Sequence, residues 1–224
     1  MIPVISSCIR PENYIKRTIN TIGNIPLMIF VNGNDSNYLT PFLSNNISVN
    51  LNPPIDKNNK LLNQFFNYKY CLEQGYNGVD KGILLIEDDI IFCKNWKKRF
   101  DTTILELEIL YKENFILSLF TNLPLCNENN IPDSHYLPIP KNRFRGTQGM
   151  YYPNKIRLEL INFFNNYDKN KIIPYDLIIK QYLIDNPNIN IFSTLPCLVQ
   201  HIGKKSSWHP SPIIDTAIIY YNEI

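Results

Sequence analysis

The chain has 224 residues, of which 44% are hydrophobic, 12% aromatic and 19% charged, so it can bury a substantial core within one domain. This composition excludes a disordered protein, a collagen and a small disulfide scaffold. The 22 Lys and Arg residues against 20 Asp and Glu give a formal net charge of +2, which is too small for general attraction to a polyanion and disfavours a dedicated nucleic-acid binder.

The cysteines and the N-terminus indicate the compartment. The cysteines lie far apart without a CxxC pair, and this odd, scattered set favours reduced, mostly buried thiols over a disulfide framework or a zinc site. They are Cys8, Cys71, Cys93, Cys126 and Cys197. The N-terminal apolar stretch is short, is interrupted by Pro3 and follows no basic segment, so we expect neither a membrane span nor a signal peptide. We therefore expect a soluble, cytoplasmic protein.

Strands and helices alternate in the first half of the sequence. Short apolar runs predict strands, and apolar residues at helical spacing predict the helices between them. The run at 26–31 is apolar throughout and ends in the turn-forming sequence NGND, as in a strand buried on both faces of a parallel sheet. In chain order we predict a strand over 2–9, a helix over 12–22, strands over 26–31 and 47–51, a helix over 60–74 and a strand over 83–86.

The second half continues the alternation with one long interruption. Residues 121–146 contain four prolines and no apolar periodicity, so we predict a loop, and a long loop in a compact domain usually lines a site. Around it we predict a helix over 96–112, a strand over 115–120, helices near 154–165 and 174–186, and a strand over 189–193. The alternation implies an α/β fold with a mostly parallel sheet, in which ligands bind at the carboxyl ends of the strands.

Three acidic residues, Glu87, Asp88 and Asp89, follow the strand-like run ILLI and precede a second apolar run, IIF. Adjacent carboxylates repel one another, and burying them unpaired is costly unless a cation neutralises them. Oxygen ligands favour Mg²⁺ or Mn²⁺, which fill their remaining positions with water and a substrate's phosphates. The alternative is a solvated acidic turn or a carboxylate that caps the next segment, but such turns seldom interrupt a buried run. We therefore expect a divalent metal site.

Two further segments carry candidate residues that also have ordinary structural explanations. In RFRGTQG, two glycines three apart permit close approach of a ligand, and Arg143 and Arg145 can meet phosphate or sugar hydroxyls. A simple turn between a loop and a strand would give the same pattern. Asp176 lies in the first turn of the helix that Pro174 starts, where a carboxylate either favours the helix dipole or serves as a general base within reach of a hydroxyl.

Near the C-terminus, the sequence QHIGKKSS offers a histidine, two lysines and two serines. The imidazole of His201 can complete the coordination of a metal that carboxylates hold. Lys204, Lys205 and Ser206 can bind a diphosphate. The structural alternatives are a histidine that caps or packs and a lysine pair that faces solvent.

In this order, the segments resemble the motifs of glycosyltransferases of the GT-A fold, which use nucleotide sugars. ILLIEDDIIF looks like the short acidic DxD-type motif of that superfamily. The resemblance implies that Asp89 binds the metal and that Asp88 helps place the metal or the ribose. PYDLIIKQYL puts Asp176 at the place of the general base of the inverting members, and His201 fits the histidine that contributes to the metal or diphosphate site.

The resemblance extends to the pocket and to the nucleotide site. RGTQGMYYP matches a glycine-containing segment that shapes the donor and acceptor pocket, which implicates Gly146, Thr147 and Gln148. The nearest likeness is to the branching N-acetylglucosaminyltransferases that extend N-glycans, which have a similar EDD and a similar QH-G-SS segment. The chain is shorter than these enzymes, and their Golgi residence is not expected to carry over. The places where the family reads the uridine are held here by Ser6, Ser7, Arg10, Asn32 and Asp35.

The resemblance implies one GT-A domain over 1–224, a Rossmann-like three-layer sandwich with a central, mostly parallel sheet. Residues 1–92 would form the nucleotide-binding half and 93–224 the acceptor and catalytic half. The implied activity is a hexosyl- or N-acetylhexosaminyltransferase that uses Mn²⁺ or Mg²⁺ and a UDP-sugar. The acceptor hydroxyl would belong to a glycan, a lipid-linked or a protein acceptor, and the sugar would be transferred with inversion. If Asp176 lay far from the sugar, retention would be favoured instead.

Two other functions remain open. A sugar nucleotidyltransferase also combines an α/β sheet with carboxylate-bound Mg²⁺, but it should carry a Gly- and Arg/Lys-rich loop after the first strand, where SSCIRPEN has no glycine. The other alternative is a catalytically inactive GT-A-like module that binds carbohydrate or serves as a structural part. The presence of Asp88, Asp89, Asp176 and His201 argues against it.

Overall fold

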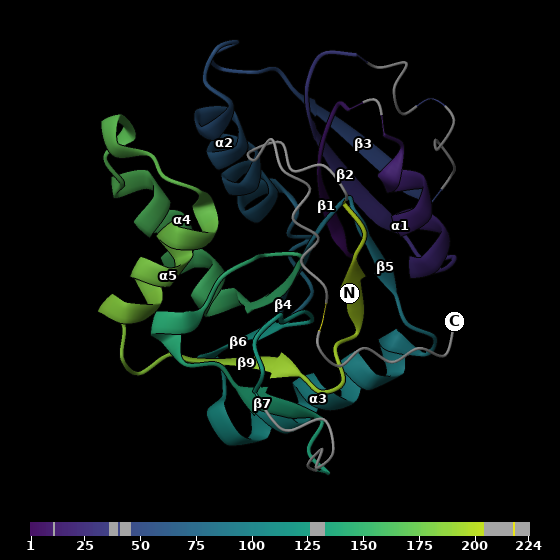
Figure 1. The fold of residues 1–224 in the computed structure, drawn as a ribbon, viewed down its shortest axis with the longest axis vertical. Helices are drawn as coiled ribbons and strands as arrows, with labels where there is room; N and C mark the ends of the chain where they lie inside the picture. Colours follow the sequence, from purple (N-terminus) through teal and green to yellow (C-terminus); the bar gives the residue numbers. More distant parts are fainter. Residues whose placement is uncertain (11, 36–39, 41–45, 126–132, 204–216, 218–224) are drawn as a thin grey trace.

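A central sheet organises the protein, and helices cover both of its faces (Figure 1). The structure is a computed structural model and describes residues 1–10, 12–35, 40, 46–125, 133–203 and 217. Within this part the sheet has eight strands. In sheet order they are β3 (Ile47–Asn52), β2 (Leu27–Asn32), β1 (Val4–Cys8), β4 (Gly82–Glu87), β8 (Gly149–Pro153), β6 (Phe115–Ser118), β9 (Asn190–Thr194) and β7 (Tyr136–Pro138).

The sheet is mostly parallel, as the sequence predicts. Strands β3, β2, β1 and β4 pair in parallel, and so do β6 and β9. Strand β8 runs against both of its neighbours, and β7 runs against β9 at one edge. Because β4 pairs with β8, strands from 1–92 and from 93–224 belong to one sheet. The parallel strands β1, β2 and β4 therefore bring their carboxyl ends to one edge, where ligands of such sheets bind.

Helices form the two outer layers, with the sheet between them. On one face, α1 (Tyr14–Ile22) and α3 (Trp96–Tyr111) share a buried cluster with Ile5 of β1 and Leu84 of β4. On the other face, α2 (Lys60–Gln74), α4 (Asn154–Asn166) and α5 (Tyr175–Asp185) share a cluster with Val4 and Ile83. Successive residues of one strand thus enter opposite clusters, which explains why the run at 83–86 is apolar throughout.

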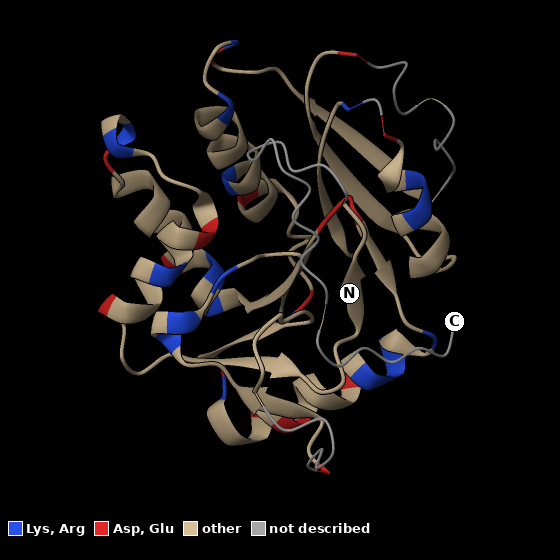
Figure 2. Cartoon of the chain, in the orientation of Figure 1, with Lys and Arg blue, Asp and Glu red and all other residues tan. Residues whose placement is uncertain are grey.

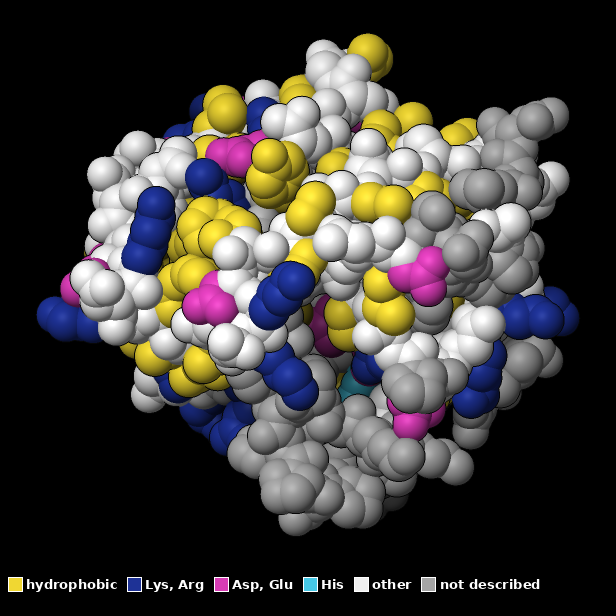
Figure 3. Space-filling view, turned by 90° about the horizontal axis from the view of Figure 1, so that it is seen from above, with side chains coloured by type: hydrophobic (Ala, Val, Ile, Leu, Met, Phe, Trp, Pro, Cys, Tyr) yellow, Lys and Arg dark blue, Asp and Glu magenta, His cyan; other side chains and the backbone are white. Residues whose placement is uncertain are grey.

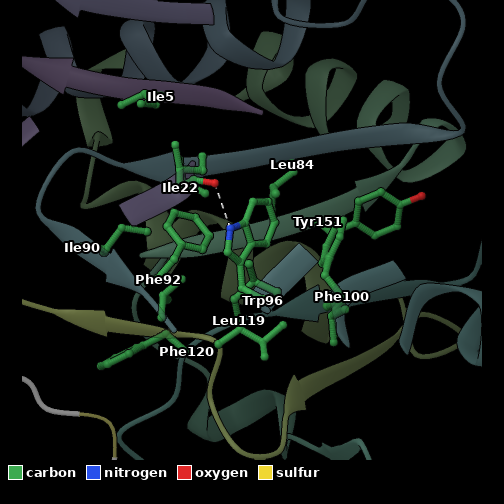
Figure 4. Packing of buried hydrophobic residues seen from close by; sticks show 14 of the residues in the cluster. Ile5, Ile22, Leu84, Ile90, Phe92, Trp96, Phe100, Leu119, Phe120 and Tyr151 are labelled. Carbon is green, nitrogen blue, oxygen red and sulfur yellow. Dashed lines mark hydrogen bonds between the residues drawn. The ribbon is translucent and has the colours of Figure 1, made fainter. Parts of the chain in front are cut away.

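A second, two-stranded sheet of β5 (Ile90–Phe92) and β10 (Val199–His201) lies on the α1 side. Figure 4 shows how aromatic residues pack beneath it: the Phe92 and Trp96 rings lie 4.5 Å apart, and the Trp96 indole N–H donates a 3.0 Å hydrogen bond to the Ile22 carbonyl. This bond fixes the start of α3 against the end of α1. The antiparallel pairing also brings His201 opposite Ile90, beside the acidic turn.

The predicted elements agree with the structure except for four strands. The predicted loop over 121–146 contains the edge strand β7 and the short 3-10 helix η3 (Lys141–Arg143), and β5, β8 and β10 were not predicted as strands. Strand β7 includes Pro138, which removes a backbone donor and is tolerated at a sheet edge. A further 3-10 turn, η4 (Lys169–Lys171), precedes α5.

The described cysteines are free thiols; Cys71, Cys93 and Cys197 are buried and Cys8 is partly buried. This agrees with the expected reduced state, and Cys126 lies outside the described residues. None of the helices in the described ranges is long and apolar enough to cross a membrane.

Candidate functional site

A cavity of about 840 Å³ lies where β1, β2 and β4 end. Residues 144–148 and the first turn of α5 bound it on the other side. Figure 3 shows a hollow on this face, with acidic and histidine side chains at its floor and Lys or Arg side chains at its rim. The residues predicted from the sequence that line the cavity are Ser6, Ser7, Arg10, Asn32, Asp88, Asp89, Gly146, Thr147, Gln148, Asp176 and His201.

The acidic turn after β4 is fixed from beneath by α1. The Thr18 hydroxyl donates to the carbonyls of Asp88 and Ile90, at 2.8 and 2.6 Å, and accepts from the Ile90 N–H at 3.2 Å. The Ile202 N–H donates to the Asp89 carbonyl at 2.8 Å. The Thr18 hydroxyl and the backbone just after β10 therefore hold the two aspartates at the cavity. The sequence pattern assigns Thr18 to the helix predicted over 12–22 and gives it no functional role.

Arg10 forms ion pairs with both aspartates. Its guanidinium contacts Asp88 Oδ1 and, at 3.1 Å, Asp89 Oδ2, and the Ser7 hydroxyl donates to Asp88 Oδ2 at 2.5 Å. The side chains of Asp88 and Asp89 are 2% and 9% exposed. The sequence predicts a divalent metal that balances these carboxylates; in this structure Arg10 supplies one positive charge against the two of them. The sequence places Arg10 at the uridine instead.

His201 reaches the same pair of carboxylates from β10. Its Nε2 lies 3.3 Å from Asp89 Oδ2. Burial raises the pKa of Asp89, but the hydrogen bond from His201 and the charge of Arg10 outweigh burial, so that the pKa is below its ordinary value. A Cβ added at Gly203 would lie 2.5 Å from Asp89 Oδ2 and 2.7 Å from His201 Nε2, so only glycine fits beside this contact.

The residues present can hold a divalent cation if the substrate supplies further ligands. Asp88 Oδ1 and Oδ2 are engaged by Arg10 and Ser7, but Asp89 Oδ1 is buried and accepts no hydrogen bond within the described residues. These residues contain no group of three or more His, Cys, Asp and Glu placed to hold a metal ion. Mg²⁺ commonly uses only one or two carboxylates together with substrate phosphates. Asp89 Oδ1 fits that donor set, and the imidazole of His201 lies beside it as a nitrogen donor.

Glu87, the first acidic residue of the motif, points to the α5 side of the cavity. Its Oε1 accepts hydrogen bonds from the Thr147 hydroxyl at 2.8 Å and from the Tyr175 hydroxyl at 3.0 Å. Burial and the neighbouring charge of Asp89 raise the pKa of Glu87. Burial also raises the pKa of Tyr175 well above its ordinary value, which keeps its phenol protonated as a donor. The sequence pattern assigned no role to Tyr175, although it precedes the predicted base.

Asp176 faces the cavity from the first turn of α5, as expected. Its Oδ2 accepts a 3.3 Å hydrogen bond from the Gly146 N–H. Gly146 has a φ of 81°, in the left-handed region, and a Cβ there would collide with the Gln148 side chain. The positive φ therefore favours the glycine that the sequence predicted for close approach, and a Cβ there would also displace the end of the Gln148 side chain. The Gly146 backbone and the Asp176 carboxylate therefore meet on the side of the cavity that residues 144–148 and α5 bound.

The β1 and β2 end of the cavity is organised by an amide that the sequence analysis missed. Asn67 of α2 donates to the Ser6 hydroxyl at 3.0 Å and accepts from the Asn52 amide at 2.8 Å. The Asn67 side chain is 4% exposed. A polar residue on the buried face of a helix was therefore the sequence signal that could have identified it. Asn32, at the end of β2, lines the cavity, whereas Asp35 is exposed and lies outside its lining.

Three of the predicted diphosphate ligands, Lys204, Lys205 and Ser206, lie outside the described residues. Their assignment to a diphosphate stays a prediction.

Solved structures share the fold of this chain, although no family model and no curated protein sequence matches it. The apo form of the glycosyltransferase GlyE from Streptococcus pneumoniae TIGR4 matches with 10% identity and a TM-score of 0.52, over 95% of this chain and 57% of that one. Apo mouse xyloside xylosyltransferase 1 matches with 9% identity and a TM-score of 0.46, over 84% and 83%. A Bacillus anthracis protein assigned as a glucose-1-phosphate thymidylyltransferase matches with 13% identity and a TM-score of 0.48, over 90% and 89%.

The GlyE match shows a GT-A-like fold. The expected fold class is thereby confirmed: a three-layer α/β sandwich with a central, mostly parallel sheet. This chain spans 57% of the GlyE chain. Because the identity is only 10%, the likeness shows the fold alone. The finer resemblance to the branching N-acetylglucosaminyltransferases stays a prediction from the motifs.

Proposed function

We propose that the protein is a glycosyltransferase that moves a sugar from a nucleoside diphosphate sugar, most simply a UDP-sugar, to an acceptor hydroxyl. The observation that carries this proposal is the shared cavity, which joins the ends of β1, β2 and β4 to Asp176 at the start of α5. An acidic pair and a candidate base thus face one space of about 840 Å³. This volume suits a cofactor-sized ligand. The sugar would be a hexose or an N-acetylhexosamine, and the acceptor a glycan, a lipid-linked or a protein acceptor.

The side chains suggest an inverting displacement. The Asp176 carboxylate accepts the proton of the acceptor hydroxyl, while the acceptor oxygen forms a bond to the anomeric carbon. The bond between that carbon and the diphosphate oxygen breaks, and the diphosphate leaves with the electron pair. Because attack and departure lie on opposite faces, the anomeric configuration inverts. The hydrogen bond from the Gly146 N–H orients the Asp176 carboxylate for this role.

The same proposal includes a divalent cation, Mn²⁺ or Mg²⁺, held by Asp89 and His201. When bound, such a cation supplies positive charge against the leaving diphosphate. Asp88, paired with Arg10 and Ser7, would keep the turn in place, and its contact with the ribose would require one of these partners to be exchanged. Ser6, Ser7 and Asn32 would contact the nucleoside end of the donor.

Thermal unfolding with a panel of nucleotides tests the proposal. Nucleoside diphosphates and their sugars, each with and without Mn²⁺, should raise the melting temperature, because a ligand that binds only the native state stabilises it. A Mn²⁺-dependent shift with the uridine series is the expected result. If a folded sample showed no shift with any nucleotide, the inactive module would become the better interpretation. If nucleoside triphosphates with sugar 1-phosphates gave diphosphate release, the protein would be a nucleotidyltransferase.

A further inference from the structure

Two cations form no ion pair with any described residue on the side of the cavity that residues 144–148 and α5 bound, which we call the acceptor side. Arg145 and Lys180 both line the cavity, beside Asp176. Within the described ranges of the chain, neither forms an ion pair or a hydrogen bond. By contrast, Arg10 is paired with the two buried aspartates of the same cavity. Of the three Arg and Lys residues that line the cavity, Arg10 is therefore engaged in ion pairs, whereas Arg145 and Lys180 form none with the described part of the protein.

The local geometry brings these charges to the candidate base. Lys180 lies four residues after Asp176 on α5, so both project from the same face of the helix. Arg145 directly precedes Gly146, whose N–H binds the Asp176 carboxylate. Asp176 thus accepts a backbone hydrogen bond and forms no ion pair with either cation. Figure 2 shows Lys and Arg residues (blue) interspersed with Asp and Glu residues (red) around α4 and α5.

An apolar surface adjoins the two cations. Leu177, next to the candidate base, lines the cavity and is 39% exposed, while the ring of Phe144 lies behind it in the buried cluster. The apolar face of a sugar ring packs on such residues, while a charged substituent reaches the cations. Guanidinium and ammonium groups bind carboxylates and phosphates through charge-assisted hydrogen bonds.

We propose that Arg145 and Lys180 form a subsite for an acidic acceptor, whose carboxylate or phosphate lies close to the hydroxyl that faces Asp176. This inference rests on the proposed transferase function and specifies its acceptor class. The donor diphosphate is not the expected partner of the pair, because Arg10, Asp89 and His201 lie together beside the carboxyl end of β4. Arg145 and Lys180 lie instead with the 144–148 segment and α5, on the far side of Glu87.

Binding of three small probes tests the subsite: methyl β-D-glucuronide, glucose 6-phosphate and neutral methyl β-D-glucoside. Saturation-transfer NMR gives a Kd for each probe, with and without UDP and the diamagnetic Mg²⁺. The wild type should bind at least one acidic probe about tenfold more tightly than the glucoside, and added NaCl should weaken only the acidic probe. The two acidic probes distinguish a carboxylate from a phosphate.

Variants show which residues cause the preference for acidic over neutral probes. Arg145→Gln and Lys180→Gln should each reduce it several-fold, and the double variant should remove it. Lys171→Gln, which removes an equally positive side chain that is 82% exposed and lies outside the cavity lining, should keep it. Thermal unfolding of each variant shows that it is folded. Equal wild-type Kd values for the acidic and neutral probes, or a preference that survives the double variant, would overturn the proposal.

The UDP shift separates this inference from the proposed function. If UDP and Mn²⁺ raise the melting temperature of every variant equally, and only Arg145→Gln and Lys180→Gln lose the preference for acidic probes, both the proposed function and the subsite are supported. If the cavity variants lose the UDP shift instead of the acidic preference, the two cations serve the donor and the inference is wrong. Absence of a UDP shift in the wild type would contradict the transferase alone, because probe binding is also measured without nucleotide.

Discussion

The Tyr175 phenol donates a 3.0 Å hydrogen bond to Glu87 Oε1 across 88 positions of sequence. The Tyr175 ring also stacks on Tyr68 of α2, with centroids 4.4 Å apart, and the Tyr68 hydroxyl is 2.7 Å from that of Tyr152 in β8. Tyr175 therefore links the first turn of α5 directly to β4 and α2, and through Tyr68 to β8. Since Asp176 is the next residue, this link sets where the candidate base stands relative to the acidic turn.

Tyr175→Phe should loosen that link without removing the ring. The stack on Tyr68 survives, but the buried Glu87 loses one of its donors, so we expect the free energy of unfolding to fall by about 1–2 kcal/mol. Urea denaturation measures the change. As a control, Tyr167→Phe removes the hydroxyl of another partly buried tyrosine, whose ring packs near Phe65, and should change stability by less than about 0.5 kcal/mol. Equal effects in both variants would show that the Glu87 bond adds no stability.

Arg10→Gln should be among the most destabilising changes at the site. It leaves two nearly buried carboxylates without their cation, and removing one partner of a buried ion pair typically costs about 3–5 kcal/mol. A second change, Asp88→Asn in the Arg10→Gln background, removes part of the repulsion and should restore some stability. Urea denaturation of the wild type, both single variants and the double variant gives the coupling energy between the two residues. A coupling near zero would contradict the ion pair.

The sequence was informative where function follows from local order. The apolar run at 83–86 required a strand buried on both faces, so the carboxylates that end it had to lie at the carboxyl edge of the sheet. The placement of Asp176 in a first helical turn followed from Pro174 in the same way. Such features depend on residues within one element, and pattern reasoning reaches them.

Contacts between distant elements were not predictable in this way. The pairing of Arg10 with Asp88 depends on β1 and β4 being neighbours, and the pattern of either strand alone leaves strand order open. Thr18 and Asn67 looked like ordinary helix residues, because their partners come from other elements. Strand β10 has only three residues and forms by pairing with β5, so its own sequence gives little signal.

Gly146→Ala should damage the acceptor side of the cavity. The residue has a φ of 81°, and its new Cβ would collide with the Gln148 side chain. Gly78→Ala is the matched control, since Gly78 has a φ of 79° but no described atom lies within 4 Å of the place that its Cβ would occupy. Both variants incur a backbone cost of about 1–2 kcal/mol, and Gly146→Ala should lose more because of the collision. Equal losses in urea denaturation would mean that the loop adapts.

Asp176→Asn should separate catalysis from donor binding. An amide cannot accept the hydroxyl proton, so transfer should fall by about 10²–10⁴-fold, while the nucleotide-induced rise in melting temperature persists. Asp185→Asn changes an exposed carboxylate at the other end of α5 and should leave transfer unaltered. Radiolabelled or coupled transfer assays measure the first effect and thermal unfolding the second. Normal transfer by Asp176→Asn would remove this residue from the mechanism and favour retention.

Cys8 offers a chemical report on the cavity that requires no acceptor. It lines the cavity at the end of β1, and burial raises the pKa of its thiol, although the charge of Arg10 acts in the opposite direction. Because only the thiolate reacts, alkylation by iodoacetamide should be slow at neutral pH and should increase with pH later than for the same cysteine in urea. A Cys126→Ser background simplifies the analysis.

Ligand protection completes this prediction. A nucleotide that fills the cavity should slow alkylation of Cys8 further, as peptide mass spectrometry can measure. Cys197 is the internal control, since it is buried outside the cavity lining and burial raises the pKa of its thiol to about 11. Its reaction should therefore remain slow with or without nucleotide. Protection of Cys8 by UDP and Mn²⁺ would locate the nucleotide at the end of β1. Unchanged alkylation at saturating UDP would place the nucleotide elsewhere.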